Sequence, residues 1–212
     1  MTLGMTGQTT NPNNPNVPVT VQTNIVQSDA AEKLFLLYKK YGVGTYGNAI
    51  INNLPIGHYI EQFQAQHATA PQNTQALAND LLAYFRTIQP IPKMGITLTG
   101  YDGQDPWVVT VDVDSGIPKR DNVDSQNNIQ YGIGRGGDTP IVDRLLSQQQ
   151  FNPLFNVMSL QDAIDFSRHL IRTTIDQMRF EPRFPTVGGP IDTLVVTRHE
   201  SKFLMQKSLI AH

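Results

Sequence analysis

The longest amphipathic pattern in the chain covers residues 159–180. Apolar side chains recur there at helical spacing, at positions 160, 163, 164, 170, 171, 175 and 178, which lays one face of a helix on a core. Ser159 followed by Asp162 resembles a capping box in which Asp replaces the usual Glu or Gln. The pattern therefore predicts a helix of roughly five turns.

Shorter patterns on both sides of this helix predict a mixture of strands and helices. Two helical stripes are separated by a polar breaker around Pro71, and alternating Val, Ile, Leu and Thr residues predict strands. The expected strands cover residues 19–26, 34–38, 43–47, 94–101, 107–113, 128–133, 192–197 and 202–209. The other expected helices cover residues 56–66, 74–88 and 141–148. Helices between groups of strands predict layers of helix and sheet.

The first 18 residues differ from the rest, because they are rich in Asn, Pro and Thr and show no apolar period. Such a segment buries too little apolar surface to offset the entropy of ordering it. We therefore expect residues 1–18 to form an exposed loop or tail. Residues 19–212 are expected to form a single domain, since this length supports one sizeable core.

Charge and composition narrow the classes of partner. The chain has 16 Lys and Arg against 18 Asp and Glu and lacks a basic run, so it is not expected to bind nucleic acid. It has no apolar run near the ~20 residues that a membrane span requires, and no secretion signal at its start. We expect a cytoplasmic protein. The absence of cysteine excludes disulfides, thiolate metal sites and a Cys nucleophile.

Two local motifs allow alternative chemistry. Residues 132–137 satisfy the glycine spacing of a dinucleotide-binding loop, but no acidic strand end follows and Asp138 would repel a phosphate. Asp112, Asp114 and Gly116 imitate part of a calcium loop, without the downstream Glu that completes it. The five histidines show no metal-ligand spacing. No cofactor and no metal are therefore expected.

Several segments, taken in chain order, are similar to a known family. They are residues 33–37 and 42–47; 99–102 and 111–116; 131–136; and 159–172 with 188–197. This ordered set resembles the proteasome-like branch of the N-terminal nucleophile hydrolases. The resemblance implies an α+β fold, a four-layer αββα sandwich of two antiparallel sheets. It also implies assembly into homo-oligomers, often rings.

The resemblance further implies a chemistry. In that family the first residue attacks a peptide or amide carbonyl, and its free α-amine serves as the base. Thr2 takes this position if Met1 is removed, and Gly47 matches the glycine whose backbone N–H stabilises the oxyanion. Lys33 is the first basic residue after Thr2 and the second choice for the lysine that tunes the amine. Its alignment with the start of a strand favours a structural role instead.

Other positions depart from the family pattern. We expect the opening hairpin with its Asp and Lys to be missing. Arg135 stands where peptidase subunits have Ser, and Phe184 and Val187 replace polar supports. The resemblance therefore predicts a threonine-type peptidase or amidohydrolase with an incomplete site. Two alternatives stay open: a nucleophile encoded upstream of Met1, and a non-catalytic subunit or binding protein with the same fold.

Overall fold

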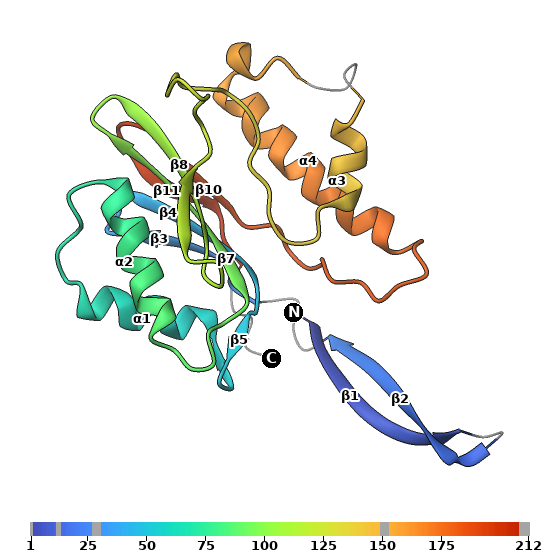
Figure 1. Cartoon of the computed structure of the whole chain (residues 1–212). Coiled ribbons are helices and arrows are strands. Elements are labelled where there is room, and N and C mark those ends of the chain that lie inside the picture. Colours follow the sequence, from blue (N-terminus) through green and yellow to red (C-terminus); the bar gives the residue numbers. More distant parts are fainter. Residues whose placement is uncertain (1, 12–13, 27–30, 149–152, 208–212) are drawn as a thin grey trace.

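The computed structural model describes residues 2–11, 14–26, 31–148 and 153–207. Its centre is a five-stranded sheet in the order β3-β4-β7-β8-β9, in which every neighbouring pair is antiparallel. The strands are β3 (Leu34–Leu37), β4 (Tyr41–Gly47), β7 (Met94–Asp102), β8 (Asp105–Asp112) and β9 (Ile117–Arg120). Figure 1 shows this sheet in the middle of the molecule.

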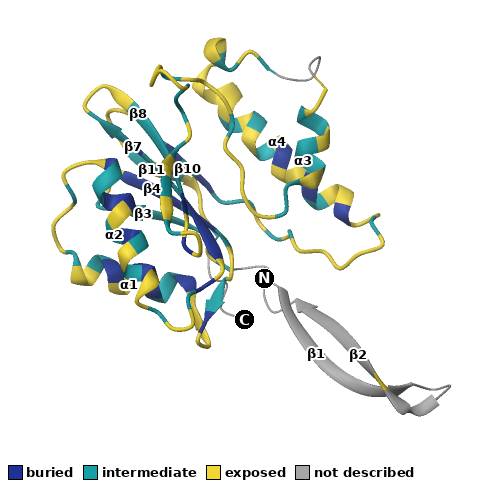
Figure 2. Ribbon diagram, viewed as in Figure 1, coloured by how far each residue is buried: buried dark blue, intermediate teal, exposed yellow. Residues whose placement is uncertain are grey.

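Helices α1 (Ile56–Gln66) and α2 (Thr74–Arg86) pack on one face of this sheet. Both helices lie close to the predicted ranges. The Asn73 side chain caps α2 by accepting a hydrogen bond from the N–H of Ala76 at 2.8 Å. Phe63 and Phe85 are completely buried between the helices and the strands, where Figure 2 shows the buried residues gathered. A small hairpin of β5 (Ile50–Ile51) and β6 (Leu54–Pro55) precedes α1.

The C-terminal half adds a second group of elements. It contains α3 (Pro140–Leu146), a short 3₁₀ turn (Phe155–Val157), α4 (Leu160–Met178), and the strands β10 (Thr193–Val196) and β11 (Ser201–Met205). The predicted capping box of α4 is confirmed, since Ser159 and Asp162 exchange side-chain and backbone hydrogen bonds. The α4 helix contacts α3 and β10.

The apolar stripe of α4 is only partly covered. Leu170, Thr174 and Met178 are buried, whereas Leu160 is 57% and Ile171 is 41% exposed. The expectation that the whole stripe lies on a core was therefore too strong. Residues 179–192 then carry the chain from α4 to β10 without a further helix or strand.

The N-terminal segment departs most from the sequence analysis. Instead of a loop over residues 1–18, the structure has β1 (Thr2–Asn11) paired antiparallel with β2 (Asn14–Val26). Threonine and valine favour extended backbone, and a two-stranded hairpin accepts Pro15 and Pro18 because both its strands are edges. We call this β1–β2 hairpin the arm. It extends away from the five-stranded sheet in Figure 1.

Two further predictions need correction. Residues 128–133 form no strand; one isolated bridge joins Val123 and Ile129 there, and β9 instead provides the outer strand next to β8. The last predicted strand ends earlier, at Met205, and residues 208 and 209 lie outside the described part. The fold is a mixed α/β arrangement with a five-stranded antiparallel sheet and four α-helices among the described residues.

The second sheet of the expected four-layer sandwich is not established. The expected sandwich requires a broad second sheet, but the described residues contain only β10 and β11 there, as a separate two-stranded sheet. It contacts β3 and β4, with α4 on β10. In the described ranges, no helix has both the length and the apolar composition needed to cross a membrane.

Candidate functional site

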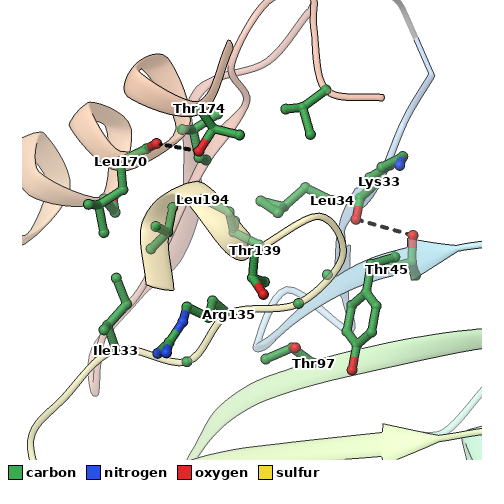
Figure 3. A pocket seen from close by; sticks show the side chains of 18 of the residues that line it. Lys33, Leu34, Thr45, Thr97, Ile133, Arg135, Thr139, Leu170, Thr174 and Leu194 are labelled. Atoms are coloured by element: carbon green, nitrogen blue, oxygen red, sulfur yellow. Dashed lines mark hydrogen bonds between the residues drawn. The ribbon is translucent and has the colours of Figure 1, made fainter. Parts of the chain in front are cut away.

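A cavity of about 480 Å³ lies between the central sheet and the C-terminal helices. Its floor comes from the start of β3 and from β4 and β7, and its opposite wall from α3, α4 and the segment that leads into α3 (Figure 3). Most of its surface is apolar. The lining includes Leu34, Val43, Tyr46, Ile133, Val142, Leu170, Ile171, Val187 and Leu194. The incomplete cover on α4 thus coincides with a space large enough for an apolar group.

Lys33 lies at this cavity, immediately before β3. Its backbone is fixed, because the Lys33 carbonyl accepts a hydrogen bond from the N–H of Thr45 at 2.8 Å and from the Thr45 hydroxyl at 3.4 Å. The side chain is partly buried, and this burial lowers the pKa of Lys33 below its ordinary value, with a smaller contribution from the positive charge of Lys207. Within the described part of the chain, the Lys33 amine forms no ion pair.

The neighbouring Lys207, unlike Lys33, forms an ion pair. Its ammonium group lies 2.7 Å from Asp192 and donates a hydrogen bond to the carbonyl of Ala31 at 3.1 Å. Its backbone N–H donates to the other Asp192 oxygen at 2.8 Å. This pair holds the segment after β11 against the segment before β3. Lys33 has no such partner among the described residues, and its lowered pKa means that its amine loses a proton more easily than an ordinary lysine.

Tyr46 forms one side of the cavity, and the position of its ring explains why residues 95 and 136 are glycine. A Cβ on Gly95 would lie 2.1 Å, and a Cβ on Gly136 2.3 Å, from atoms of the Tyr46 ring. Burial raises the pKa of Tyr46, and the charges of Asp112 and Asp121 raise it further. Gly136 belongs to the glycine-rich segment 132–137, so in this structure that glycine is explained by packing against Tyr46.

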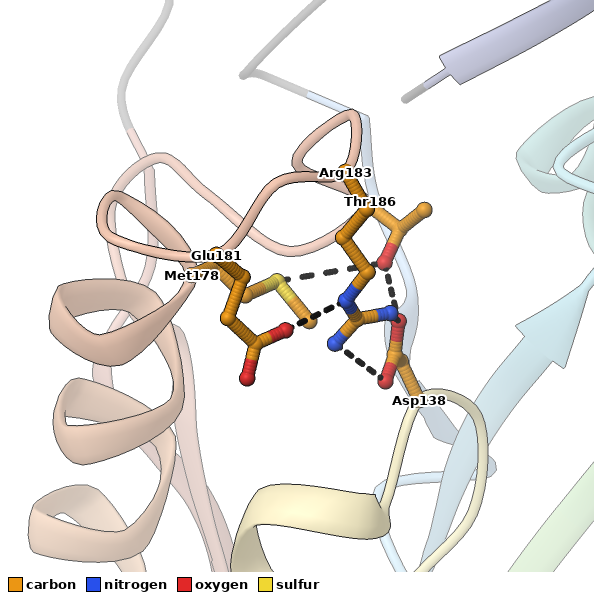
Figure 4. Close-up of polar contacts among 5 residues, drawn as sticks. All are labelled: Asp138, Met178, Glu181, Arg183 and Thr186. Atoms are coloured by element: carbon orange, nitrogen blue, oxygen red, sulfur yellow. Dashed lines mark hydrogen bonds and ion pairs between the residues drawn. The ribbon is translucent and has the colours of Figure 1, made fainter.

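The acidic and basic groups near α3 are paired with each other. Arg183 binds both oxygens of Asp138, at 2.5 and 3.1 Å, and also contacts Glu181, while the Thr186 hydroxyl donates to Asp138 (Figure 4). The hydrogen bond from Arg183 is the main reason that the pKa of Asp138 is held below its usual range. Asp138 is thereby kept ionised, and this cluster ties the segment after α4 to the edge of the cavity.

Arg135, at the cavity, forms an ion pair with Asp143 of α3, and the Thr139 hydroxyl donates to the other Asp143 oxygen at 2.7 Å. The Arg135 charge is therefore already compensated. The sequence marks Arg135 only as a departure from the family pattern. It gave no signal for the pairing of Asp192 with Lys207 or of Asp138 with Arg183, because these partners are 15 and 45 residues apart.

The structure separates the three residues predicted for the site. Lys33, the second choice, lines the cavity. Gly47 directly follows the cavity residue Tyr46, but it is exposed and does not line the cavity. Its φ of +85° and the Lys93 carbonyl, 2.6 Å from where a Cβ would lie, explain the glycine on structural grounds. Thr2 is in β1 opposite Val26 and is not a lining residue.

The calcium-like motif also has a structural explanation. The Asp112 carboxylate accepts hydrogen bonds from the N–H groups of Asp114 and Ser115, at 3.0 and 3.2 Å. This arrangement is an Asx turn that closes the connection between β8 and β9. Gly116, with a φ of +77°, completes the turn.

The architecture resembles that of a proteasome-related protein. The structure aligns with a solved structure of Anbu, a Gly-1 mutant from Hyphomicrobium sp. strain MC1, with a TM-score of 0.53 and 16% sequence identity. The alignment covers 97% of this chain and 80% of that one. At this identity the likeness supports only a distant proteasome-like fold.

The sequence comparisons correct the resemblance stated above. No family model matches the chain, and no curated protein matches it in sequence. The membership in the proteasome-like N-terminal nucleophile hydrolases inferred from the ordered motifs is therefore wrong as a family assignment. The motifs are short local patterns, and one of them, residues 131–136, forms neither a helix nor a strand. β1 and β2 form an N-terminal hairpin, but residues 2–26 contain no Asp or Lys, so it is not the Asp- and Lys-bearing hairpin of the family pattern.

Proposed function

We propose that the cavity at Lys33 binds an amide or peptide substrate with an apolar side chain, and that the protein hydrolyses it by threonine-type chemistry. The observation that carries this proposal is the partly buried Lys33 amine, whose pKa is lowered, at the edge of a largely apolar space. The apolar lining would receive the substrate side chain. The neutral form of the amine would accept a proton from an attacking hydroxyl.

In this proposal the nucleophile is the Thr2 hydroxyl, freed by removal of Met1. Its oxygen would add to the substrate carbonyl, and its proton would pass to the Lys33 amine. The amide nitrogen would then leave after receiving a proton, and water would release the acyl group from Thr2. Gly47 would donate its backbone N–H to the oxyanion. The assignment of Thr2 and Gly47 rests on their sequence positions, and that of Lys33 on its place at the cavity.

A set of variants tests the proposal with fluorogenic peptides that carry apolar residues before the reporter. Lys33→Ala and Lys33→Arg should each lower kcat/KM by about 10²-fold or more, because arginine cannot release a proton at neutral pH. Thr2→Ala should abolish turnover, whereas Thr2→Ser should retain part of it. Lys119→Ala removes an exposed lysine and should leave the rate unchanged. Equal rates for the Lys33 variants and the wild type would refute the proposal.

The second candidate function is that of a non-catalytic subunit of a homo-oligomer. It is favoured by the position of Thr2 in β1, opposite Val26, with no described contact to the cavity. Intact-mass analysis of the purified protein separates the candidates. Retention of Met1, together with absence of peptide hydrolysis at high protein concentration, supports the non-catalytic subunit. Loss of Met1 with turnover that depends on Lys33 supports the hydrolase.

A further inference from the structure

A second cavity, of about 460 Å³, lies between α1 and α2. This volume is in the range of small-molecule sites. Figure 1 shows α1 and α2 on one side of the central sheet and α3 and α4 on the other, so this cavity is separate from the one at Lys33. Its polar and aromatic lining includes Tyr59, Gln62, His67, Asp80, Tyr84 and Thr87.

Aromatic rings in this lining are held in place by the core. The His67 ring stacks on Phe63 with centroids 4.4 Å apart, and the Tyr84 ring meets Phe63 edge to face at 5.4 Å. Phe63 is completely buried, and Tyr59 is buried as well. Aromatic rings attract cations, and rings that are fixed before a ligand arrives lower the entropic cost of binding it.

The hydroxyl groups that line the cavity already donate their protons within the protein. Tyr59 donates to the carbonyl of Ile51 at 3.0 Å. Tyr84 donates to the side-chain oxygen of Gln62 at 3.3 Å, and Thr87 donates to the carbonyl of Tyr84 at 2.7 Å. Since a hydroxyl has a single proton and two lone pairs, these groups offer a ligand acceptors rather than donors.

His67 offers a further acceptor. Its Nδ1 lies 3.0 Å from the carbonyl of Phe63. Because a carbonyl only accepts, Nδ1 carries a proton, and in the neutral ring Nε2 is then an acceptor. The Tyr38 hydroxyl donates to the carbonyl of His67 at 2.7 Å and fixes its backbone. The lining also contains the exposed amides of Gln62 and Gln66, which can donate or accept.

Asp80 is the only Asp, Glu, Lys or Arg among the lining residues. Its side chain is partly buried and, within the described ranges, has no ion pair and no hydrogen-bond partner. Its charge adds to the effect of burial in raising the pKa of Tyr38, which places the carboxylate near the end of the cavity that His67 forms. A carboxylate in this situation gains a charge-assisted hydrogen bond when a cationic donor binds.

A metal ion does not fit this set of groups. Among the described residues there is no group of three His, Cys, Asp or Glu side chains that could hold one, and a structural zinc or calcium ion takes roughly four or more ligands. The cavity instead combines one carboxylate, several neutral acceptors and aromatic rings. This combination suits an organic cation with N–H donors.

We propose that the cavity between α1 and α2 binds a small organic ammonium ion. The ammonium group donates to the Asp80 carboxylate and to Nε2 of His67, and the apolar body of the ligand lies against Tyr59 and Tyr84. A primary ammonium has three N–H donors, which matches the surplus of acceptors. This inference does not depend on the proposed hydrolysis.

NMR of the uniformly ¹⁵N-labelled full chain at pH 7 tests the proposal with two compounds that share a benzyl group. Benzylamine, which is protonated at this pH, should shift the amide resonances of residues 59–67 and 80–88 and saturate with a Kd of about 1 mM, as expected for a ligand of its size. Benzyl alcohol lacks the charge and should bind at least about tenfold more weakly. Equal binding of the two compounds, or shifts confined to the Lys33 cavity, would overturn the proposal.

Two variants with matched controls identify the charge. Asp80→Asn should weaken benzylamine binding at least about tenfold, whereas Asp165→Asn, at an exposed position of α4, should leave it unchanged. Ala83→Lys places an ammonium group three residues from Asp80 on an exposed face of α2, where such a pair favours the helix. It should block binding, and Ala163→Lys on α4 should not. Wild-type affinity in Asp80→Asn or in Ala83→Lys, with circular dichroism matched to the wild type, would overturn the proposal.

Discussion

The ion pair between Asp192 and Lys207 gives the sharpest stability prediction. Asp192 is 9% and Lys207 is 15% exposed, and their contacts join the start of β10, the segment after β11 and the carbonyl of Ala31. Removal of one partner from a buried pair leaves a charge without compensation and costs about 3–5 kcal/mol. Because both groups keep some contact with water, we take the lower end, about 3 kcal/mol, for Asp192→Asn and for Lys207→Met.

The double variant Asp192→Asn/Lys207→Met should cost much less than the sum of the single variants, since neither charge then remains unpaired. We expect a coupling energy of about 2 kcal/mol or more from urea unfolding at pH 7. The exposed pair of Glu200 and Lys202, at 59% and 53% exposure, is the control, and its cycle should give about 0.5 kcal/mol. A coupling at Asp192 and Lys207 no larger than this control would refute the argument.

The same substitution links the ion pair to the cavity. The charge of Lys207 contributes to the lowered pKa of Lys33, but burial contributes more. Lys207→Met should therefore raise the pKa of Lys33 only part of the way to its ordinary value. Side-chain NMR titration of Lys33 in both proteins measures this difference. Complete recovery of the ordinary value would show that burial is not the main cause.

Three further predictions concern packing and pH. Phe85→Ala should lower the free energy of unfolding by about 3–5 kcal/mol, because Phe85 is fully buried. Phe184→Ala, at a 37% exposed position, should lower it by under about 1.5 kcal/mol. Equal losses in the two variants would contradict the assigned core. Gly136→Ala should lower the free energy of unfolding by about 1–3 kcal/mol, because the added Cβ would clash with the Tyr46 ring. Gly132→Ala should leave stability almost unchanged, because no atom lies within 4 Å of the added Cβ. The reverse order would contradict the packing. The hydrogen bond from Arg183 lowers the folded-state pKa of Asp138, so the stabilisation by this carboxylate is present above its unfolded pKa of about 3.9 and disappears as pH falls through its folded pKa. In Asp138→Asn, the free energy of unfolding measured with urea should therefore fall less steeply between about pH 6 and 2 than in the wild type. An unchanged pH profile would contradict this role.

The sequence predicted the elements whose apolar period is long and whose ends are marked. The helix α1 has its predicted bounds, and the capping box of Ser159 and Asp162 begins α4 as expected. These features are determined locally, by side chains within one turn of each other. They can therefore be predicted without knowing the tertiary structure.

Features that depend on distant parts of the chain were missed. Residues 1–18 were taken for a loop because Asn, Pro and Thr dominate their composition, whereas residues 19–26 were predicted as a strand and lie in β2. Pairing of β1 with β2 supplies the order that the composition of the first 18 residues did not indicate. Residues 128–133 have apolar and polar alternation but find no neighbouring strand, since β9 pairs with β8 instead. Local propensity does not decide such competition.

The candidate site shows the same division. Gly47 was the preferred position, and its positive φ and the nearby Lys93 carbonyl explain it by backbone geometry. Lys33 was the second choice, because a lysine before a strand has no distinctive signal. Its place at the cavity results from elements more than 100 residues away, α4 and β10, which close the opposite wall.

Titration of Lys33 tests the central claim most directly, since each role assigned to the cavity requires an amine that loses its proton more easily than an exposed lysine. In side-chain NMR of the wild type, the pKa of Lys33 should lie clearly below the ordinary value of about 10.4. If Lys33 titrates near this ordinary value, it is a solvated surface lysine, and the proposed site is wrong.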